Sequence, residues 1–283
     1  MASPIGAQFL PDGFAGPRGL RALAREGSIV ELGHYVARRR ASSRTRRSTP
    51  YVGRATGRAA QPVVLVPGFM AGDLSLSLIG RTLRESGHRT YRAQIRANVG
   101  CTRTAVEALE QRVEAIAIRR NRKVALVGHS LGGMISRGLA ARRPDLVSGI
   151  VTMGSPMLAP AAVHRLLLWD LQVLLGLSRL GVGGLMRADC VAGPCAEQSF
   201  ADSRLPLPEG VAFTAIYSRR DGIVDWKGCI DPQAEAVEVW ASHLGMAIDP
   251  RVCDVVQDVV SALPAEVPGQ APLLPAYRSA HAG

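Results

Sequence analysis

Short apolar runs alternate with longer amphipathic stretches through most of the chain. Apolar runs, each bounded by turn-forming or charged residues, occur at 63–66, 123–128, 147–153 and 211–217, and the more polar stretches 89–95 and 235–240 can form further strands. The stretches between them repeat apolar residues at helical spacing. This alternation predicts an α/β fold with a mostly parallel central sheet and helices on both of its faces.

Local signals mark the N-termini of two of the predicted helices. Thr104 and Glu107 form a capping box that predicts a helix start. Asp249 followed by Pro250 predicts the start of a last helix whose valines face the core. The folded domain is therefore predicted to span 61–263.

The two ends of the chain differ in composition from this domain. Residues 1–60 hold eleven arginines against three acidic residues, which accounts for +8 of the formal net charge of +11. They predict a basic, partly disordered extension with one helix around 19–37, and the alternative for this extension is attraction to anionic lipid or nucleic acid. For the chain as a whole nucleic acid is not an expected partner, because the remaining residues carry little net charge. Residues 264–283, rich in Pro and Ala, predict a disordered tail.

The N-terminus and the cysteines bear on the compartment of the protein. Residues 1–30 lack an uninterrupted apolar core followed by a small-residue cleavage site, so the expected location is the cytoplasm or the periphery of a membrane. The five cysteines do not have zinc-ligand spacing. Cys190 and Cys195 are spaced so that a disulfide between them could close a small loop in an oxidising compartment. The sequence does not decide between this disulfide and two free thiols.

The stretch 157–200 interrupts the alternation of strands and helices. Its part from Ala161 to Leu177 is more apolar than a surface helix, while Asp170 and Arg179 argue against a membrane span. Two interpretations remain: a buried core helix, or a helical cap over an active-site mouth that faces acyl chains or a lipid surface. We favour the cap, because the stretch lies between one strand and the later candidate catalytic segments.

A G-x-S-x-G pattern, Gly128 to Gly132, directly follows the strand at 123–128 and precedes a helical stretch. Glycines on both sides of Ser130 allow a sharp turn without Cβ clashes. Such a turn exposes the serine hydroxyl at the end of the sheet and at a helix N-terminus, where the free N–H groups favour negative charge. The pattern therefore predicts a nucleophilic serine.

A serine hydroxyl is a poor nucleophile, so acyl transfer needs a histidine to take its proton and an acid to hold that histidine. Among the six histidines, His243 alone follows a candidate acid and lies in a loop after a short strand. Asp221 comes directly after the strand 211–217 and is the predicted acid, whereas Asp225 is expected to form a turn. The order Ser130, acid, histidine is the one found in hydrolases with this type of serine turn.

The oxyanion of an acyl-transfer intermediate needs two N–H donors. One is normally the amide after the nucleophile, here that of Leu131. The other is expected from the turn after the strand 63–66, where the amide of Phe69 follows Pro67 and Gly68.

Five segments together resemble bacterial lipases and esterases of the α/β-hydrolase fold. They are Val66-Pro-Gly-Phe69, Gly128-His-Ser-Leu-Gly-Gly133, Gly154-Ser-Pro156, Tyr217-Ser-Arg-Arg-Asp-Gly-Ile-Val-Asp-Trp226 and Ser242-His-Leu-Gly-Met246. The resemblance runs from about Gln61 to Leu263. It implies catalytic roles for Ser130, Asp221 and His243, with oxyanion amides at Phe69 and Leu131. One departure is Pro67, which stands where many relatives have a histidine before the glycine.

The resemblance also implies hydrolysis of carboxylic esters, with acyl glycerols as natural candidates and no cofactor or metal required. An acyltransferase that uses the same acyl-enzyme is the first alternative, and a non-enzymatic binding module on the hydrolase fold is the second. The expected partner is an ester or lipid substrate. Contact with a lipid surface through the cap or the basic extension is a further expectation.

Overall fold

The computed structural model describes residues 6–27, 33–34, 36–37, 40 and 60–263. Their strands form one six-stranded, fully parallel sheet in the order β2-β1-β3-β4-β5-β6. The strands are β1 (Pro62–Val66), β2 (Arg89–Arg92), β3 (Val124–His129), β4 (Val147–Met153), β5 (Ala212–Tyr217) and β6 (Glu235–Glu238). Each corresponds to a predicted strand, and the predicted parallel sheet is confirmed.

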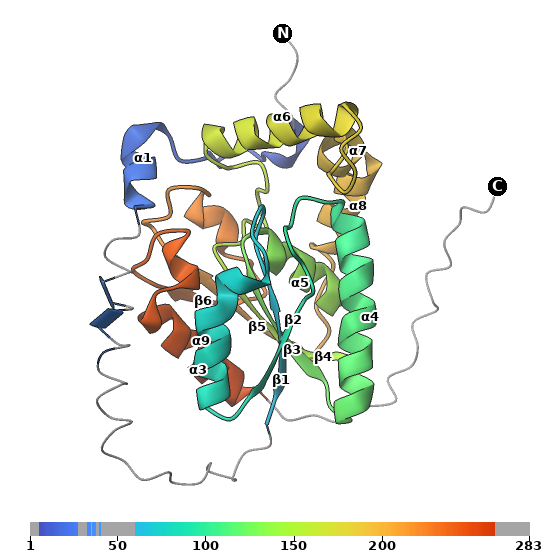
Figure 1. The fold of residues 1–283 in the computed structure, drawn as a ribbon, viewed down its shortest axis with the longest axis vertical. Helices are drawn as coiled ribbons and strands as arrows, with labels where there is room; N and C mark the ends of the chain where they lie inside the picture. The colour runs from blue at the N-terminus through green and yellow to red at the C-terminus, as the bar shows by residue number, and fades with distance from the viewer. Residues whose placement is uncertain (1–5, 28–32, 35, 38–39, 41–59, 264–283) are drawn as a thin grey trace, which may run out of the picture.

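Helices pack on both faces of this sheet (Figure 1). The helices with defined bounds are α1 (Gly19–Arg25), α3 (Ser77–Glu85), α4 (Thr102–Arg120), α5 (Leu131–Arg142), α6 (Arg165–Arg179), α7 (Ala188–Ala192), α8 (Pro194–Asp202) and α9 (Pro250–Ala262). α3 and α9 lie side by side on one face, and α4 and α5 cover the other.

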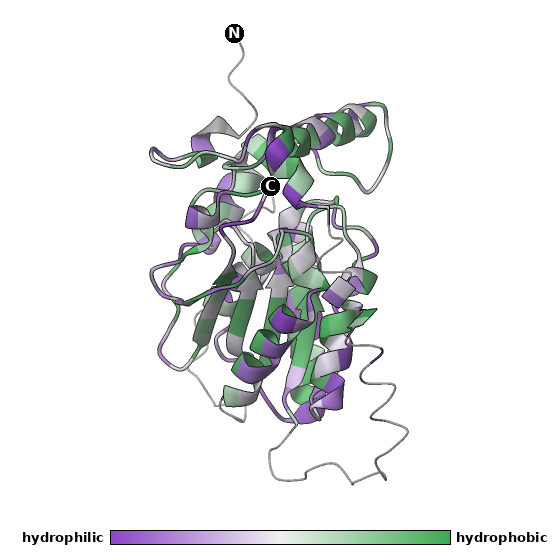
Figure 2. Cartoon of the chain, turned by 90° about the vertical axis from the view of Figure 1, so that its left-hand side faces the viewer, coloured by the Kyte–Doolittle hydropathy of each residue, from purple (hydrophilic) through white to green (hydrophobic). Residues whose placement is uncertain are grey.

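Alternate residues of β1 point into two separate cores. Val64 and Val66 join an apolar cluster with residues of α4 and α5, while Val63 and Leu65 join a second cluster with α3 and α9. Every residue of β1 is buried, as expected for a strand that is covered on both faces. Figure 2 shows the same arrangement as apolar strands enclosed by helices of mixed polarity.

The structure bears out one of the two predicted helix starts. Asp249 caps α9 by accepting a hydrogen bond from the amide of Arg251, with Pro250 at the first helical position. The predicted capping box is wrong: α4 begins at Thr102, and Cys101 at its N-cap makes no side-chain capping hydrogen bond. Thr104 already lies inside the first turn, so its hydroxyl is not at the position from which a residue caps a helix.

Residues 6–27, called the N-terminal segment below, pack against the domain. The amide of Ala161 donates to the carbonyl of Phe9 (3.2 Å). The amide of Ala15 donates to the carboxylate of Asp225 (3.0 Å). These contacts join the segment to the insertion after β4 and to the loop after β5.

The position of the N-terminal segment differs from the predicted division of the chain, in which 1–60 is an extension. α1 ends at Arg25 and residue 27 is not helical, so no continuous helix spans 19–37, although the described residues 33–34 and 36–37 are helical as well. The many arginines dominate the composition of this region, whereas its packing depends on a few apolar residues such as Phe9 and Ala22, which are buried. The predicted disordered tail, 264–283, lies outside the described residues.

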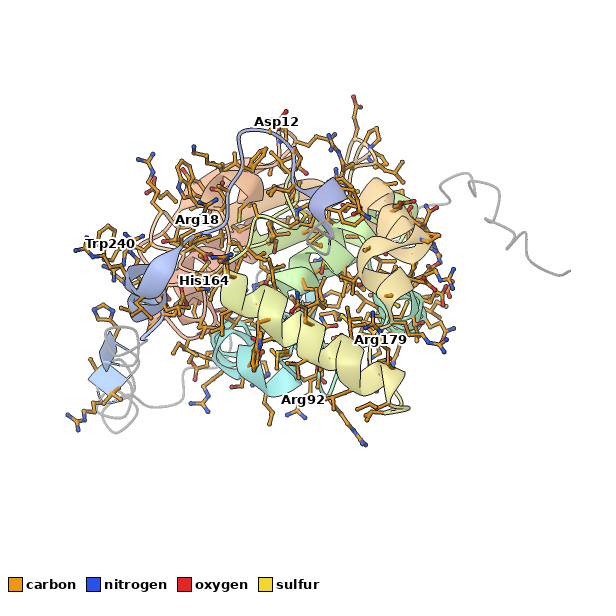
Figure 3. The ribbon with its side chains drawn as sticks, turned by 90° about the horizontal axis from the view of Figure 1, so that it is seen from above. Asp12, Arg18, Arg92, His164, Arg179 and Trp240 are labelled. Atoms are coloured by element: carbon orange, nitrogen blue, oxygen red, sulfur yellow. The ribbon has the colours of Figure 1, made fainter. Side chains whose placement is uncertain are left out.

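The insertion between β4 and β5, residues 157–200, contains α6, α7 and most of α8. These helices lie above the carboxyl ends of the strands, and α6 crosses the top of the molecule (Figure 1). Seen from above, α6 runs from near His164 to Arg179, beside the N-terminal segment that carries Asp12 and Arg18 (Figure 3). None of the described helices has both the length and the apolar character that crossing a membrane requires.

The close contact between α5 and β1 gives a test of the fold. A Cβ at Gly132 would lie 2.2 Å from the carbonyl oxygen of Val66, whereas a Cβ at Gly138 in the same helix would be 3.7 Å from its nearest neighbour. We expect Gly132→Ala to lower the free energy of unfolding by about 2 kcal/mol or more, because the backbone of α5 or of β1 must move to make room for the methyl group. Gly138→Ala should leave it within about 1 kcal/mol, or raise it, since alanine favours helix. Denaturant unfolding measures both, and equal effects would contradict the packing.

Candidate active site

Ser130 lies at a strained turn between β3 and α5. Its φ is 52° and its ψ is −122°, in the region of positive φ that residues with a Cβ rarely adopt. Its amide donates to the carbonyl of Met153 (2.8 Å), which ties the turn to the end of β4. The structure therefore has the strand, turn and helix that the G-x-S-x-G motif predicts.

The glycines around this serine are required by close backbone packing. A Cβ at Gly128 would lie 2.5 Å from backbone atoms of α5. A Cβ at Gly133 would lie 2.0 Å from the hydroxyl of Ser155, and a Cβ at Gly68 would lie 3.1 Å from the Cβ of Ser130. The turn thus fits between β1 and the loop after β4 because these positions carry no side chain.

Asp221 and His243 form a buried pair at the same edge of the sheet. Ser130 follows β3, Asp221 comes after β5, and His243 comes after β6. His243 Nδ1 lies 2.7 Å from Asp221 Oδ2, and both side chains are buried. The other oxygen, Oδ1, accepts hydrogen bonds from the amides of Ile223 (2.9 Å) and Val224 (2.8 Å). The acid is therefore held by its own loop and aimed at the histidine.

The strand between the serine and the acid also ends next to this pair. Gly154 follows β4 with a φ of +57°, and a Cβ there would lie 3.0 Å from His243 Nδ1. Glycine at this position therefore leaves the space that the ring of His243 occupies.

The electrostatic surroundings favour a charged His243. Burial by itself lowers the pKa of the His243 ring, but the charge and hydrogen bond of Asp221, with a further contribution from the charge of Glu26, raise it above the ordinary value. His129 behaves in the opposite way, because burial and the neighbouring His243 lower its pKa to about 3. The neutral His129 ring lies 4.8 Å from the His243 ring, and its Nε2 donates to the His243 carbonyl (2.9 Å).

Asp225 has the contacts of a turn-forming residue. Its Oδ1 accepts a hydrogen bond from the amide of Lys227 (3.1 Å) at the start of a short 3₁₀ helix, Trp226–Cys229. Its Oδ2 accepts from the amide of Ala15. These contacts agree with the turn predicted for Asp225.

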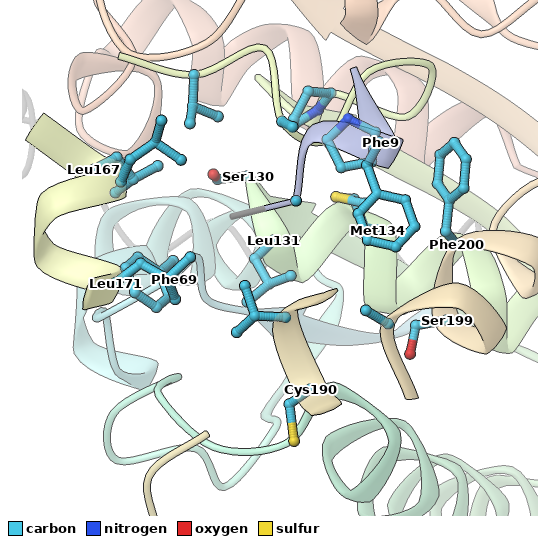
Figure 4. A pocket seen from close by; sticks show the side chains of 18 of the residues that line it. Phe9, Phe69, Ser130, Leu131, Met134, Leu167, Leu171, Cys190, Ser199 and Phe200 are labelled. Carbon is cyan, nitrogen blue, oxygen red and sulfur yellow. The ribbon is translucent and has the colours of Figure 1, made fainter. Parts of the chain in front are cut away.

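A cavity of about 200 Å³ opens on Ser130. Phe69 and Leu131, the residues predicted to supply the oxyanion amides, belong to its lining. Apolar side chains make up most of the remaining wall, and they come from the N-terminal segment, α5 and the insertion: Phe9, Met134, Val163, Leu167, Leu168, Leu171, Met186, Val191 and Phe200. Figure 4 shows Ser130 with Leu167 and Leu171 on one side, and with Phe9 and Phe200 on the other.

Glu26 was not predicted to lie near this site. Its carboxylate accepts hydrogen bonds from the amides of Gly222 (2.7 Å), His243 (3.0 Å) and Leu244 (2.9 Å). Nothing in the sequence around Glu26 signals this position, because it follows a short helix in a region whose composition indicates an extension. Phe9, in the same region, was likewise not predicted to line the cavity.

Comparisons with known proteins bear on the fold and on the relatives of the chain. A family model described as alpha/beta hydrolase fold matches residues 61–180. The triacylglycerol lipase of Vibrio cholerae serotype O1 is 34% identical over 98 residues, which are 33% of this chain and 31% of the relative. The triacylglycerol lipase of Pseudarthrobacter phenanthrenivorans is 30% identical over 104 residues, 34% of this chain and 33% of the relative. The chain thus spans about a third of the length of these curated relatives.

Solved structures share the fold over a larger part of the chain. The mature form of the Bacillus licheniformis lipase BlEst2 superposes with a TM-score of 0.57 at 15% identity, over 75% of this chain and 96% of that one. The chain therefore has the α/β-hydrolase fold. Its resemblance to bacterial lipases and esterases is confirmed.

Proposed function

We propose that the protein hydrolyses carboxylic esters with apolar acyl groups, through an acyl-enzyme on Ser130. The main support is the buried Asp221–His243 hydrogen bond at the sheet edge where Ser130 lies in its strained turn. The relatives named as triacylglycerol lipases support acyl glycerols as the substrate class.

In the proposed mechanism, His243 takes the proton of Ser130 as the hydroxyl attacks the ester carbonyl. The amides of Phe69 and Leu131 stabilise the oxyanion, and His243 then protonates the leaving alcohol. Water, activated by the same histidine, releases the acid. The raised pKa of His243 fits this role, because Asp221 stabilises the imidazolium that forms during each step.

The apolar wall of the cavity supports a preference for long acyl groups. Leu167, Leu168 and Leu171 of α6 line it, so each added acyl carbon can exchange water for apolar contact. We infer that the insertion acts as the cap of the site, with one face of α6 against the substrate.

The opposite face of α6 supports contact with a lipid surface. Leu166, Trp169, Val173 and Leu177 recur at helical spacing and are 47%, 60%, 41% and 40% exposed. An apolar row of this kind on a helix without a membrane-spanning length fits the interface of a lipid aggregate.

The proposed mechanism is tested by substitutions of its three side chains. We expect Ser130→Ala to lower kcat/KM for p-nitrophenyl butyrate by about 10³-fold or more, and to abolish labelling by a serine-reactive phosphonate. Asp221→Asn should lower turnover by about 10³- to 10⁴-fold, because the histidine loses its orienting acceptor. Asp225→Asn is the matched control and should lose much less. A larger loss in Asp225→Asn than in Asp221→Asn would assign the role of the acid to Asp225. Near-parental turnover by a folded Ser130→Ala variant would contradict the proposed mechanism.

The cap is tested by the acyl-chain profile of a double variant, Leu167→Ser with Leu171→Ser. The loss of apolar wall should lower kcat/KM severalfold for octanoate and longer esters and spare acetate, because only long chains reach these residues. Leu166→Ser with Val173→Ser, on the exposed face of the same helix, is the control and should keep the parental profile on soluble esters. Equal losses for acetate and octanoate would contradict the cap.

A further inference from the structure

The end of α1 lies against the two loops that carry the acid and the histidine. Glu26 directly follows this helix, and its Oε1 accepts hydrogen bonds from the amides of both Gly222 and His243. Its Oε2 accepts a third from the amide of Leu244. Gly222 is the residue next to Asp221, so one carboxylate holds the main chain on both sides of the Asp221–His243 bond.

The glycine next to the acid is what permits this approach. A Cβ at Gly222 would lie 2.1 Å from the carbonyl oxygen of Ala22 and 3.0 Å from Glu26 Oε1. The N-terminal segment and the loop after β5 are therefore in backbone contact at this point.

The geometry links the positions of the two loops to each other. Hydrogen bonds to a charged acceptor are stronger than those to a neutral one, and three of them converge on one side chain. A shift of either loop relative to the other breaks at least one of these bonds. Glu26 is not among the residues that line the cavity, so it acts on the substrate only through these loops.

We propose that Glu26 is a positioning residue, which holds Asp221 and His243 in register and so makes activity depend on the N-terminal segment. This inference rests on the proposed ester hydrolysis for its kinetic readout. The hydrogen bonds of Glu26 can also be probed without any turnover, so the positioning role of Glu26 and the proposed ester hydrolysis can fail separately.

The test compares Glu26→Gln with Asp12→Asn, which removes the same charge from an exposed position of the same segment. For Glu26→Gln we expect kcat on p-nitrophenyl butyrate to fall about 10- to 100-fold with KM nearly unchanged, since a misplaced acid–base pair affects the transition state more than binding. The acid limb of its pH profile should move to lower pH, because one of the charges that raise the pKa of His243 is gone. Asp12→Asn should change neither quantity.

Amide hydrogen exchange at Gly222, His243 and Leu244 is the readout that needs no substrate. Exchange at these three amides should be faster in Glu26→Gln than in the parent. Parental kcat and pH profile in Glu26→Gln, whether or not its melting temperature falls, would make Glu26 a purely structural contact and overturn the proposal. Should the Gln variant not fold, Glu26→Asp shortens the side chain while keeping its charge, and a parental kcat there would overturn it equally. If the parent itself neither turns over esters nor reacts with the phosphonate, the proposed function fails. Unchanged amide exchange in Glu26→Gln would then overturn the positioning role of Glu26 as well.

A second inference comes from three cysteines on separate elements. Cys101 directly precedes α4, Cys190 lies in α7 and Cys195 lies in α8. Their three sulfur atoms lie within 4.8 Å of one another, and the sulfurs of Cys101 and Cys195 are 3.2 Å apart. All three residues are partly exposed and carry free thiols.

These distances fit a thiolate metal site. With zinc–sulfur bonds of about 2.3 Å, two thiolates of a tetrahedral site are about 3.8 Å apart. The observed separations, 3.2 Å for one pair and no more than 4.8 Å for the others, are close to this value. A disulfide would use only two of the three sulfurs. No fourth His, Cys, Asp or Glu joins the group in the described part of the chain, so a fourth position would be open to water.

We propose that Cys101, Cys190 and Cys195 bind a thiophilic divalent cation, with Zn²⁺ as the probe. Soft sulfur ligands select such ions over Mg²⁺ or Ca²⁺. Binding would exchange the thiol protons for the cation and tie α7 and α8 of the insertion to the start of α4.

The test titrates the reduced full-length chain with Co²⁺ and then with Zn²⁺. We expect one equivalent of Co²⁺ to give thiolate-to-cobalt absorption, Zn²⁺ to displace it, and the melting temperature to rise. Cys195→Ser should weaken Zn²⁺ binding at least about tenfold, while Cys253→Ala, in the core away from the cluster, should bind like the parent. Binding that is absent, or unchanged in Cys195→Ser, would overturn the proposal. So would the loss of two titratable thiols in metal-free protein, because it would assign the cluster to a disulfide.

Discussion

The rest of the site depends on the backbone at Ser130, which holds a positive φ in a space that only glycines leave open. Such a conformation costs about 1–3 kcal/mol and persists where the surrounding structure determines it. Here the surroundings are α5 packed against the end of β1 at Gly132, and the hydrogen bond from the Ser130 amide to β4. The two cores on either face of the sheet stabilise these contacts and thereby direct the serine into the cavity.

A parallel sheet then decides which other groups can meet this serine. All six strands end at the same edge, so the loops after β5 and β6 bring Asp221 and His243 together although they are distant from Ser130 in sequence. Their hydrogen bond is buried, and the loops around it are joined by the carboxylate of Glu26. Hydrogen bonds to charged groups contribute about 1.5–3 kcal/mol each. They add to the apolar anchoring of these loops, in which Val224 and Met246 are buried.

The insertion contributes part of the cavity wall through α6, a helix that is apolar on two sides. The inner side of α6 lines the cavity through residues such as Leu167 and Leu171, while Trp169 and Val173 on the outer side are exposed. A helix that only covered a core would need one apolar face. The second face therefore requires an explanation outside the fold, and a lipid surface is the one that the proposed substrate class supplies.

Patterns in the sequence were enough to predict the order of strands and helices, the serine turn, and the cap of α9 at Asp249 and Pro250. These features follow from periodicity and from local backbone sterics, which act over a few residues and so leave a readable pattern. The choice of Asp221 over Asp225 also rested on a local fact, its place directly after a strand. The start of α4 was missed by three residues, because the predicted N-cap was Thr104 and the observed one is Cys101, which has no capping side-chain hydrogen bond to signal it.

Contacts that leave no local pattern in the sequence became visible in the folded chain alone. In the sequence, Glu26 is one acidic residue in an arginine-rich stretch, and nothing distinguishes it from a solvated surface carboxylate. The spacing of the cysteines predicts no zinc site and at most a loop between Cys190 and Cys195, yet the fold brings Cys101 to both of them. Contacts between residues this far apart depend on where the whole chain runs. That path results from burying both faces of the sheet at once, a condition that no short stretch of sequence contains.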